Sequence, residues 1–348
     1  MGRGAISGRA LRCAHRGLAF ALSFVLIVVM LGVLALCSQR AAAAQPSVVR
    51  ELTKLRGESS TTYELSDGSL RSEFFSSPIR FRDAAGAWRA IDTRLLSDAK
   101  SGEYVAAAMP FAVRLGAAQP QVRLGADRYD LSLQPRGLAS KAAVVLGDLA
   151  TYPAVAVDTD LRYQVLAEGV KEELLLASAA APRRFSFSLA HPGLTLRYDL
   201  QEGWGLYAEN AKQPLFVLGG LCVFDSSVSK AGEPAYCAGA TMKVSVGRAE
   251  STITYEVPEA WVNASERVFP IHIDPTITFG QSSCTDTYVS SAFPDTAYAG
   301  SQELKVGRYD ASTGHNRTLI KFDLSSIAGH YVPTAQLHMY QFHQYYYS

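Results

Sequence analysis

Residues 314–327 read "GHNRTLIKFDLSSI", and their pattern decides the fold class at this end of the chain. Every second residue from Thr318 to Leu324 is apolar or β-branched, whereas the residues between them, from Arg317 to Asp323, are mostly polar. Side chains of a β-strand alternate between its two faces, so this period of two predicts a half-buried strand. Its apolar face requires a second layer to cover it.

Short stretches of the same kind recur towards the N-terminus, with Gly, Pro and Asp between them. They include "DRYDLSLQP" (127–135), "RFSFSL" (184–189), "GLTLRYDL" (193–200) and "STITYEVP" (251–258). Only "PSVVRELTKL" (46–55) has a helical pattern. Strands at such intervals are typical of a β-sandwich or barrel. We predict an all-β chain, with a sandwich-like leading domain followed by an incomplete, jelly-roll-like β-sandwich module.

The N-terminus indicates export. The first 17 residues contain four arginines and no acidic residue, and residues 18–36 are almost entirely apolar. Ala42 and Ala44 then occupy the small-residue positions of a cleavage site, which predicts a signal peptide over 1–44 and a mature chain that begins at Gln45. The protein would be secreted or held at the cell surface, with no membrane span after cleavage. The alternatives are an uncleaved anchor and, less favoured, a lipoprotein through Cys37.

Charge argues against one class of partner. Five of the 33 basic residues and none of the 32 acidic residues lie in residues 1–44, so the mature chain would carry a net charge of −4. Nucleic-acid binding draws on a dense positive field, which this balance lacks. We therefore predict that nucleic acid is not a partner.

Three cysteines remain after residue 44. Cys222 and Cys237 bracket a turn-rich loop between two apolar runs, and a hairpin there would bring them together. In an oxidising environment this predicts a disulfide, although two unpaired buried thiols are the alternative. Cys284 has no evident partner, and no Cys/His spacing suits zinc.

Motifs that carry catalysis are missing from the sequence. "GWGLYA" (203–208) has the spacing of a dinucleotide-binding loop, but no helix follows it. Neither a nucleophile elbow, a P-loop nor a zinc-protease motif occurs. We predict no enzymatic activity and no cofactor. The aspartates of the last module could ligate a structural Ca²⁺ or simply end turns, and turns are favoured; they are Asp286, Asp295, Asp310 and Asp323.

Two stretches resemble a known kind of protein. "TDLRYQVLAEGVKEELLL" (159–176) and "EVPEAWVNASERVFPIHIDPTIT" (256–278) resemble the N-terminal region of bacterial wall-associated, RHS/YD-repeat surface proteins. In those proteins a phrase similar to "FPIHIDPT" closes the leading β domain. The resemblance covers roughly residues 50–278 and implies a leading domain over 45–278.

The final segment resembles another family. "TDTYVSSAFPDTAYAGSQELKVGRYDASTGHNRTLIKFDLSSIAG" (285–329) is similar to the start of a DNRLRE domain, grouped with carbohydrate-binding module family 96. The matching motifs are Asp-Thr-Tyr at 286–288, Pro-Asp-x-x-Tyr at 294–298, Leu-x-Val-Gly at 304–307 and Asn-Arg-x-Leu-x-x-Phe-Asp at 316–323. After a linker over 279–284, this predicts a partial module over 285–348. "VPTAQLHMY" (332–340) would begin a further strand, and family members continue beyond it.

That resemblance implies sugar binding to a polysaccharide or cell-wall glycan. Aromatic rings stack on the apolar faces of sugars, and Asn or Arg side chains bond hydroxyls and uronate carboxylates. The candidates are Tyr288, Phe293, Tyr298, Tyr309, Asn316 and Arg317. Each aromatic ring could instead fill a core, and the favoured interpretation of Asn316 and Arg317 is that they hold a turn.

The function expected from these observations is a non-catalytic leading segment of an RHS-like surface protein that carries a carbohydrate-binding-type module. One alternative is the N-terminal carrier of a polymorphic toxin. Another is the accessory front end of a secreted polysaccharide-degrading enzyme.

Overall fold

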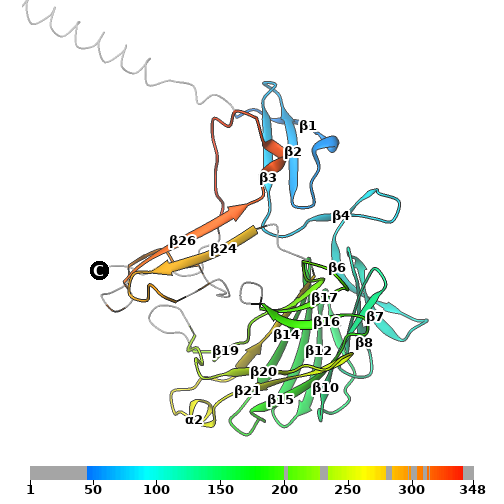
Figure 1. Ribbon diagram of the computed structural model, residues 1–348, viewed down its shortest axis with the longest axis vertical. Coiled ribbons are helices and arrows are strands. Elements are labelled where there is room, and N and C mark those ends of the chain that lie inside the picture. Colours follow the sequence, from blue (N-terminus) through cyan, green and yellow to red (C-terminus); the bar gives the residue numbers. More distant parts are fainter. Residues whose placement is uncertain are drawn as a thin grey trace, which may run out of the picture. The chain divides into compact units, whose positions relative to one another are not determined.

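A computed structural model describes residues 45–199, 203–227, 234–279, 284–296, 298, 304–308, 312 and 314–339. These residues fall into two compact units, one made of residues up to Glu51 with Tyr63–Arg71, the other of the remainder. Nearly all of the regular structure is antiparallel strand (Figure 1), which confirms the all-β prediction. Within the described ranges no helix is long and apolar enough to cross a bilayer. The predicted signal peptide and Ala44 lie outside these ranges.

Two large sheets build the sandwich. The first has the order β20-β21-β15-β10-β9-β8-β7-β6. Its strands are β6 (Asp92–Asp98), β7 (Glu103–Ala108), β8 (Ala112–Gly116), β9 (Val122–Ala126), β10 (Tyr129–Arg136), β15 (Arg184–Ala190), β20 (Thr241–Ser245) and β21 (Glu250–Glu256). The second has the order β11-β12-β13-β14-β23-β18-β17-β16; in addition, β22 pairs with β14, and β19 pairs with β22. Its strands are β11 (Val144–Leu146), β12 (Leu149–Ala156), β13 (Thr159–Leu166), β14 (Gly169–Leu176), β16 (Thr195–Asp199), β17 (Gly203–Tyr207), β18 (Phe216–Leu218), β19 (Cys222–Phe224), β22 (Ile271–Asp274) and β23 (Thr276–Phe279).

Most pairings join strands that follow one another along the chain. Strands β6 to β10 form one meander, and β11 to β14 form another. The β13–β14 hairpin is the most regular, with unbroken register from Thr159↔Leu176 to Leu166↔Gly169. Some pairings join strands that are far apart in the sequence. Examples are β10 with β15, and β14 with β22 and β23. The strands β22 and β23 come from the "FPIHIDPTIT" stretch, so this phrase completes the second sheet.

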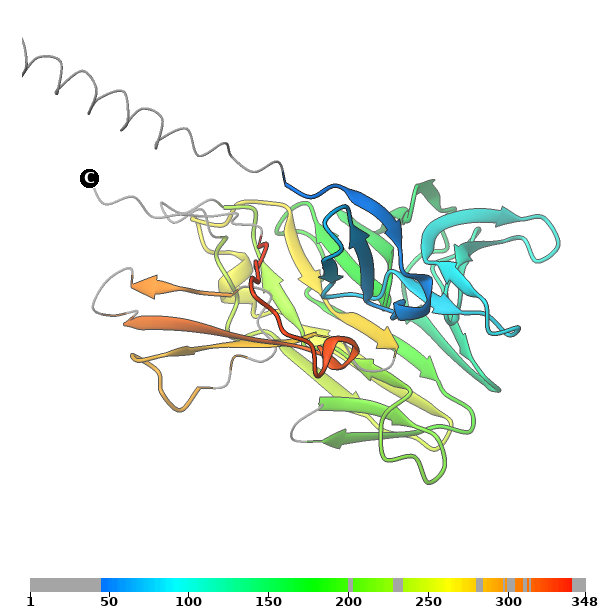
Figure 2. The ribbon, with the colours of Figure 1, turned by 90° about the horizontal axis from the view of Figure 1, so that it is seen from above.

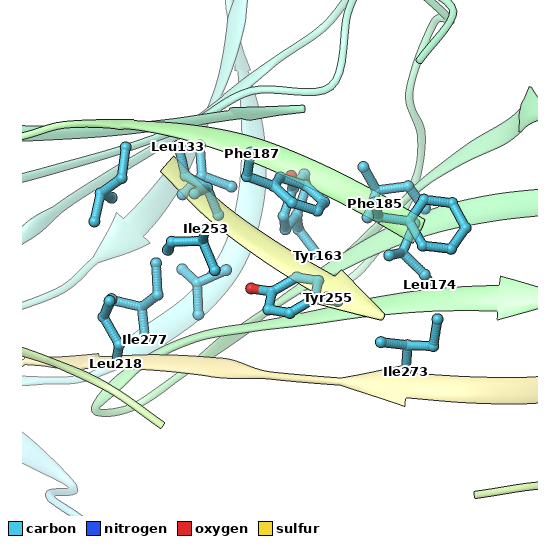
Figure 3. Packing of buried hydrophobic residues seen from close by; sticks show 14 of the residues in the cluster. Leu133, Tyr163, Leu174, Phe185, Phe187, Leu218, Ile253, Tyr255, Ile273 and Ile277 are labelled. Atoms are coloured by element: carbon cyan, nitrogen blue, oxygen red, sulfur yellow. The ribbon is translucent and has the colours of Figure 1, made fainter. Parts of the chain in front are cut away.

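The core lies between the two sheets and follows from the alternation in the sequence. In β15, Phe185, Phe187 and Leu189 are buried, whereas the serines between them are half-buried on the other face. The facing sheet supplies Tyr163, Leu174 and Ile277 (Figure 3). The Phe187 ring lies 5.4 Å from the ring of Tyr255. Full burial of such a side chain contributes about 1.5–3 kcal/mol, so these layers account for much of the stability of the sandwich.

One ionisable side chain is embedded in this core. Glu172 of β14 points to the same side as Val170 and Leu174 and is buried. No hydrogen bond of good geometry reaches its carboxyl oxygens among the described residues, although the nearby hydroxyls of Tyr255 and Tyr163 partly offset the effect of burial on its pKa. An enclosed cavity of about 10 Å³, lined by Glu172, Tyr255 and Ile277, adjoins it and has room for about one water molecule. Burial raises the pKa of Glu172 to about 8, so this carboxyl is largely protonated at neutral pH.

The first strands form small sheets of their own. Strands β1 (Val48–Glu51), β2 (Ser60–Leu65) and β3 (Leu70–Phe74) form one, and β4 (Arg80–Arg82) pairs with β5 (Trp88–Ala90). A 3₁₀ helix, η1 (Thr53–Leu55), follows β1. The helix predicted over 46–55 is therefore wrong, because β-branched Val48 and Val49 favour a strand and that strand has β2 as its antiparallel partner. The α-helix of the described residues is short, α2 (Glu259–Val262).

The last module contains a three-stranded antiparallel sheet in the order β24-β26-β25 (Figure 2, orange and red). Its strands are β24 (Cys284–Ser290), β25 (Gly307–Arg308) and β26 (His315–Phe322), followed by a 3₁₀ helix, η2 (Ser325–Ile327). Strand β26 alternates between exposed and half-buried residues, as its sequence predicts. The predicted linker is too long at both ends, because Phe279 belongs to β23 and Cys284 to β24.

The strand predicted from residue 332 onwards is absent from the described residues 332–339. These residues are exposed throughout, and so is Tyr331 before them. A strand is stabilised by a neighbour that takes up its backbone hydrogen bonds, and no described strand pairs with this segment. Its apolar pattern is that of a strand, but pattern alone does not supply a partner.

Candidate carbohydrate-binding surface

The pairing of β24 with β26 sorts the predicted site residues onto two faces of the module sheet. Tyr288 lies opposite Thr318, and Ser290 lies opposite Asn316, on the face we call the inner face. Val289 lies opposite Arg317 on the other side, which we call the outer face. The sequence analysis treated Asn316 and Arg317 as one group, whereas consecutive residues of a strand point in opposite directions.

Tyr288 and Tyr298 stack on each other. Their ring centroids are 4.1 Å apart and the planes differ by 21°. Tyr288 is only 7% exposed, and Tyr298 is half-buried. This is the packing expected of aromatic residues that fill a core, the alternative considered for each ring, and it leaves little of Tyr288 for a ligand. Tyr309 lies outside the described residues.

Phe293 is the accessible aromatic candidate. It lies in the turn after β24, where its amide donates to the Ser290 carbonyl and its carbonyl accepts from the Thr296 amide. Its side chain is 54% exposed. An exposed ring on a hydrogen-bonded turn is well placed for stacking on a sugar.

The turn before β26 is held by residues that the sequence analysis did not select. The Ser291 amide donates to the His315 carbonyl, and the His315 amide donates to Ser291 Oγ at 2.8 Å. Gly314 has a φ of 62°, and a Cβ there would lie 2.6 Å from Ser291 Oγ. Only glycine fits this left-handed position without displacing Ser291. Among the described contacts, Gly314 and Ser291 hold this turn, and the turn-holding role of Asn316 and Arg317 stays a prediction.

The outer face is cationic and partly apolar. Arg317, Lys321 and His315 are exposed along β26. Leu319 (57% exposed) and Val289 lie among them, and Arg308 of β25 is opposite His315. Guanidinium and ammonium groups suit carboxylates or phosphates, while the apolar side chains suit the C–H faces of a sugar ring. Lys321 was missed as a site residue, although the alternation places it beside Arg317.

The aspartates do not assemble a metal site among the described residues. No group of three or more His, Cys, Asp or Glu side chains there could hold a metal ion. Asp323 Oδ1 accepts a hydrogen bond of 3.0 Å from the Ser325 amide at the start of η2, and this bond lowers the pKa of Asp323. That is the turn-forming role that the sequence analysis favoured. Asp310 lies outside the described residues.

The structure forms no disulfide between Cys222 and Cys237. The Cys237 amide donates to the Val223 carbonyl, and Phe224 pairs with Tyr236, so Cys237 lies opposite Val223. Cys222 is therefore one residue out of register and on the opposite face of the ladder from Cys237. The loop does bring the two segments together, as predicted, but in a register that separates the two sulfur atoms.

Glu173, His272 and Ser226 form a row of polar side chains on the sandwich that the sequence did not indicate. His272 Nδ1 lies 2.8 Å from Glu173 Oε1, and His272 Nε2 lies 3.4 Å from Ser226 Oγ. Although burial acts to raise it, the hydrogen bond with His272 keeps the pKa of Glu173 below its usual value. The order resembles a hydrolytic triad, but the Ser226 hydroxyl donates to the Pro270 carbonyl at 2.7 Å. The Ser226 amide is bonded to the Val268 carbonyl, so this row joins β22 to the segment after β19.

Comparisons with known proteins place these observations in context. Residues 278–346 match the family described as Carbohydrate-binding module family 96. The tRNA(Glu)-specific nuclease WapA of Bacillus subtilis subsp. natto (strain BEST195) is 26% identical over 329 residues, which cover 85% of this chain and 14% of that protein. The tRNA3(Ser)-specific nuclease WapA of Bacillus spizizenii is 26% identical over 330 residues, with the same coverage. The tRNA nuclease WapA of Bacillus subtilis (strain 168) is 29% identical over 208 residues, 56% of this chain and 9% of that protein. No solved structure matches the chain.

These findings correct one prediction and support another. The relatives are named as nucleases, which contradicts the prediction of a protein without enzymatic activity. The chain spans about 14% of the longest-matched relatives, so the similarity concerns a small part of each. The resemblance to carbohydrate-binding module family 96 is confirmed, and such a module fits an extracellular or cell-surface location. Residues 278–346 thus match the model of carbohydrate-binding module family 96, and 85% of the chain is similar to a small part of a tRNA nuclease.

Proposed function

We propose that this chain is the exported carrier part of a WapA-type tRNA nuclease toxin, and that it holds the toxin at a cell-surface glycan. The observation that carries the proposal is the extent of the similarity, which covers 85% of the chain and so extends beyond the sandwich alone. The carrier alternative considered for the sequence explains this better than a free-standing surface protein does. An RHS-repeat association and the predicted signal peptide over 1–44 belong to the same proposal.

The geometry of the module supports glycan attachment. Arg317 and Lys321 are four residues apart in β26 and share the outer face, with Leu319 between them. A repeating anionic sugar can place a carboxylate or phosphate on each cation while its ring covers Leu319. Phe293 adds an exposed ring at the end of β24. Attachment through several weak contacts of this kind gives useful avidity on a polymer that repeats the same group.

The nuclease activity enters as the activity of the whole toxin. In this proposal tRNA is the substrate of the protein that contains the chain, as the names of the relatives state for them. The prediction that nucleic acid is not a partner then applies at most to the surface of the carrier. The mature carrier's predicted charge of −4 is compatible with export and with attachment that relies on a local cationic face.

The test is sedimentation of the purified chain with isolated bacterial cell walls. We expect the chain to pellet with the walls, and expect the double variant Arg317→Ser/Lys321→Ser to lose binding several-fold because two charge-assisted contacts are removed. The matched control, Arg89→Ser/Arg94→Ser, removes two exposed arginines that are each paired with an aspartate, and it should bind as the parent does. In a second arm, the exported gene product that contains this segment should cleave tRNA. Equal binding by both variants, or intact tRNA, would contradict the corresponding half of the proposal.

A further inference from the structure

A hollow of ligand size lies on the sandwich, and none of the described residues of the module line it. It is an open groove of about 740 Å³. Its walls come from the segment before and at the start of β15, from β20, from the end of β21 and from the start of α2. Binding sites for small ligands and sugar units have volumes of roughly 300–1,000 Å³, so the groove can hold a few sugar residues.

The groove has an uneven charge balance. Three cations line it, Arg183, Arg184 and Lys243, against the two carboxylates of Glu256 and Glu259. Arg183 pairs with Glu259 at 3.3 Å. Glu256 pairs with both other cations. Its Oε1 lies 3.2 Å from Arg184 Nη1, and its Oε2 pairs with Lys243 Nζ. The hydrogen bond from Lys243 lowers the pKa of Glu256, so the carboxylate is ionised at neutral pH. One positive charge is left over.

The strand register explains why these cations gather. Arg184, Glu256 and Thr241 form one cross-strand row, and Lys243 and Thr254 lie in the next row with Ser186. Both rows are on the face of the sheet turned away from the core, because Phe185 and Tyr255 between them are buried. Ser186 Oγ and Thr254 Oγ1 are 3.1 Å apart. The hydroxyl that lines the groove is that of Thr241, in the same row as Arg184 and Glu256.

The cations are free to exchange partners. The side chains of Arg184 and Lys243 are 70% and 65% exposed. Exposed ion pairs contribute little to stability, so a ligand carboxylate can replace Glu256 at small cost. Val157, Pro182 and Pro258 add apolar wall to the groove. The net positive charge, the Thr241 hydroxyl and the apolar wall together match a sugar that carries one carboxylate.

We propose that this groove is a second glycan site, which binds a segment of a carboxylate-bearing polysaccharide through Arg184 and Lys243. The inference rests on the proposed function for its class of partner, a glycan, but it uses none of the same residues. A polysaccharide bound here would place its carboxylate beside Arg184 and Lys243, which share one glutamate. Its sugar ring would pack against the apolar wall. The carrier would then have two independent contacts with glycan.

The test titrates the full chain with polygalacturonate and with neutral galactan, using calorimetry or affinity electrophoresis. We expect polygalacturonate to bind and Arg184→Ser/Lys243→Ser to weaken that binding about tenfold, as expected for the loss of two charge-assisted contacts. Arg89→Ser/Arg94→Ser, which changes the net charge equally, should leave the affinity unchanged. The groove residues are exposed, so the variant is expected to fold, and thermal melting verifies this.

The outcomes separate the groove from the module. If the groove variant binds polygalacturonate as the parent does, the groove proposal is overturned, while cell-wall sedimentation of Arg317→Ser/Lys321→Ser still decides the proposed function. If Arg184→Ser/Lys243→Ser loses affinity for polygalacturonate while Arg317→Ser/Lys321→Ser still pellets with cell walls, the groove proposal is supported. The proposed attachment through the module is then contradicted. Equal competition by polyglutamate or polyglycerol phosphate at matched charge would show a general polyanion site and overturn the assignment to a carboxylate-bearing glycan.

Discussion

The sandwich and the module sheet share the same alternating sequence pattern but differ in what covers it. In the sandwich, alternate residues of β15 meet the side chains of a second sheet and are almost completely buried. In β26, the residues of the corresponding parity are only half-buried among the residues that the structure describes. An alternating pattern thus shows which side chains point inward, whereas burial also requires a second layer. The energetic weight of an apolar residue depends on that layer.

The largest expected effect contrasts one phenylalanine from each region. Phe187→Ala should lower the free energy of unfolding by about 3–5 kcal/mol, because it empties a fully buried site. Phe322→Ala should cost less, about 1 kcal/mol, since its side chain is only half-buried. Urea denaturation, with hydrogen exchange read separately in β15 and β26, measures both. A Phe322 cost equal to that of Phe187 would mean that the module face is covered.

The second effect concerns the carboxyl group of Glu172, which is buried in the sandwich core. The pKa of Glu172 is about 8 in the folded chain against an ordinary value of 4.5, so between these pH values the folded state keeps a proton that the unfolded state has lost. The free energy of unfolding should therefore fall as pH rises through that window, by on the order of 3 kcal/mol after allowing for relaxation around the ionised group. Glu172→Gln should remove this slope.

Urea denaturation at pH 5, 7 and 8.5 follows that slope. Glu250→Gln is the control, because Glu250 is exposed and bonds with Ser188 and Arg136 lower its pKa. Its stabilising contribution is lost only as pH falls through that lowered value, below the window of Glu172. A parent chain whose stability is constant from pH 5 to 8.5 would show that water reaches Glu172.

The smallest expected effect compares two glycines with positive φ. Gly314→Ala in the module places a Cβ against Ser291 and should cost about 2 kcal/mol, whereas Gly86→Ala, with nothing within 4 Å, should cost about 1 kcal/mol. Hydrogen exchange of the β26 amides should quicken in the first variant and remain unchanged in the second. Equal exchange in the two variants would mean that the turn before β26 tolerates a side chain.

Much of the fold could be predicted because alternation is local. The patterns around Phe187 and Ile320 identify strands and their inward faces without any knowledge of partners. Partners are set by register, which the sequence does not display. Cys237 lies opposite Val223 and not opposite Cys222, so the two cysteines are on different faces. Asn316 and Arg317 are consecutive in β26, so their side chains are on different faces as well.

Two features of the candidate sites required the assembled sheets. Lys243 and Arg184 come from strands on either side of β21, so the basic groove exists only after β20, β21 and β15 have aligned. Glu172 looks like an ordinary polar residue of a strand until the parity of Val170 and Leu174 places it in the core. The family resemblance of the last module, in contrast, was visible in its motifs because turns and glycines have fixed positions along the chain.

Strand β14 pairs with β22 and β23, which are synthesised about 100 residues later, so the second sheet cannot be completed until those strands have been made. The meander β11 to β14 is complete once residue 176 has emerged, yet the edge of β14 stays open until residues 271–279 arrive. An open edge can pair with a neighbouring chain. The unfinished sheet can pair with other chains during this interval, so slow or interrupted synthesis favours aggregation. Because β22 and β23 close the sheet, the sandwich folds only when the whole segment up to residue 279 is present.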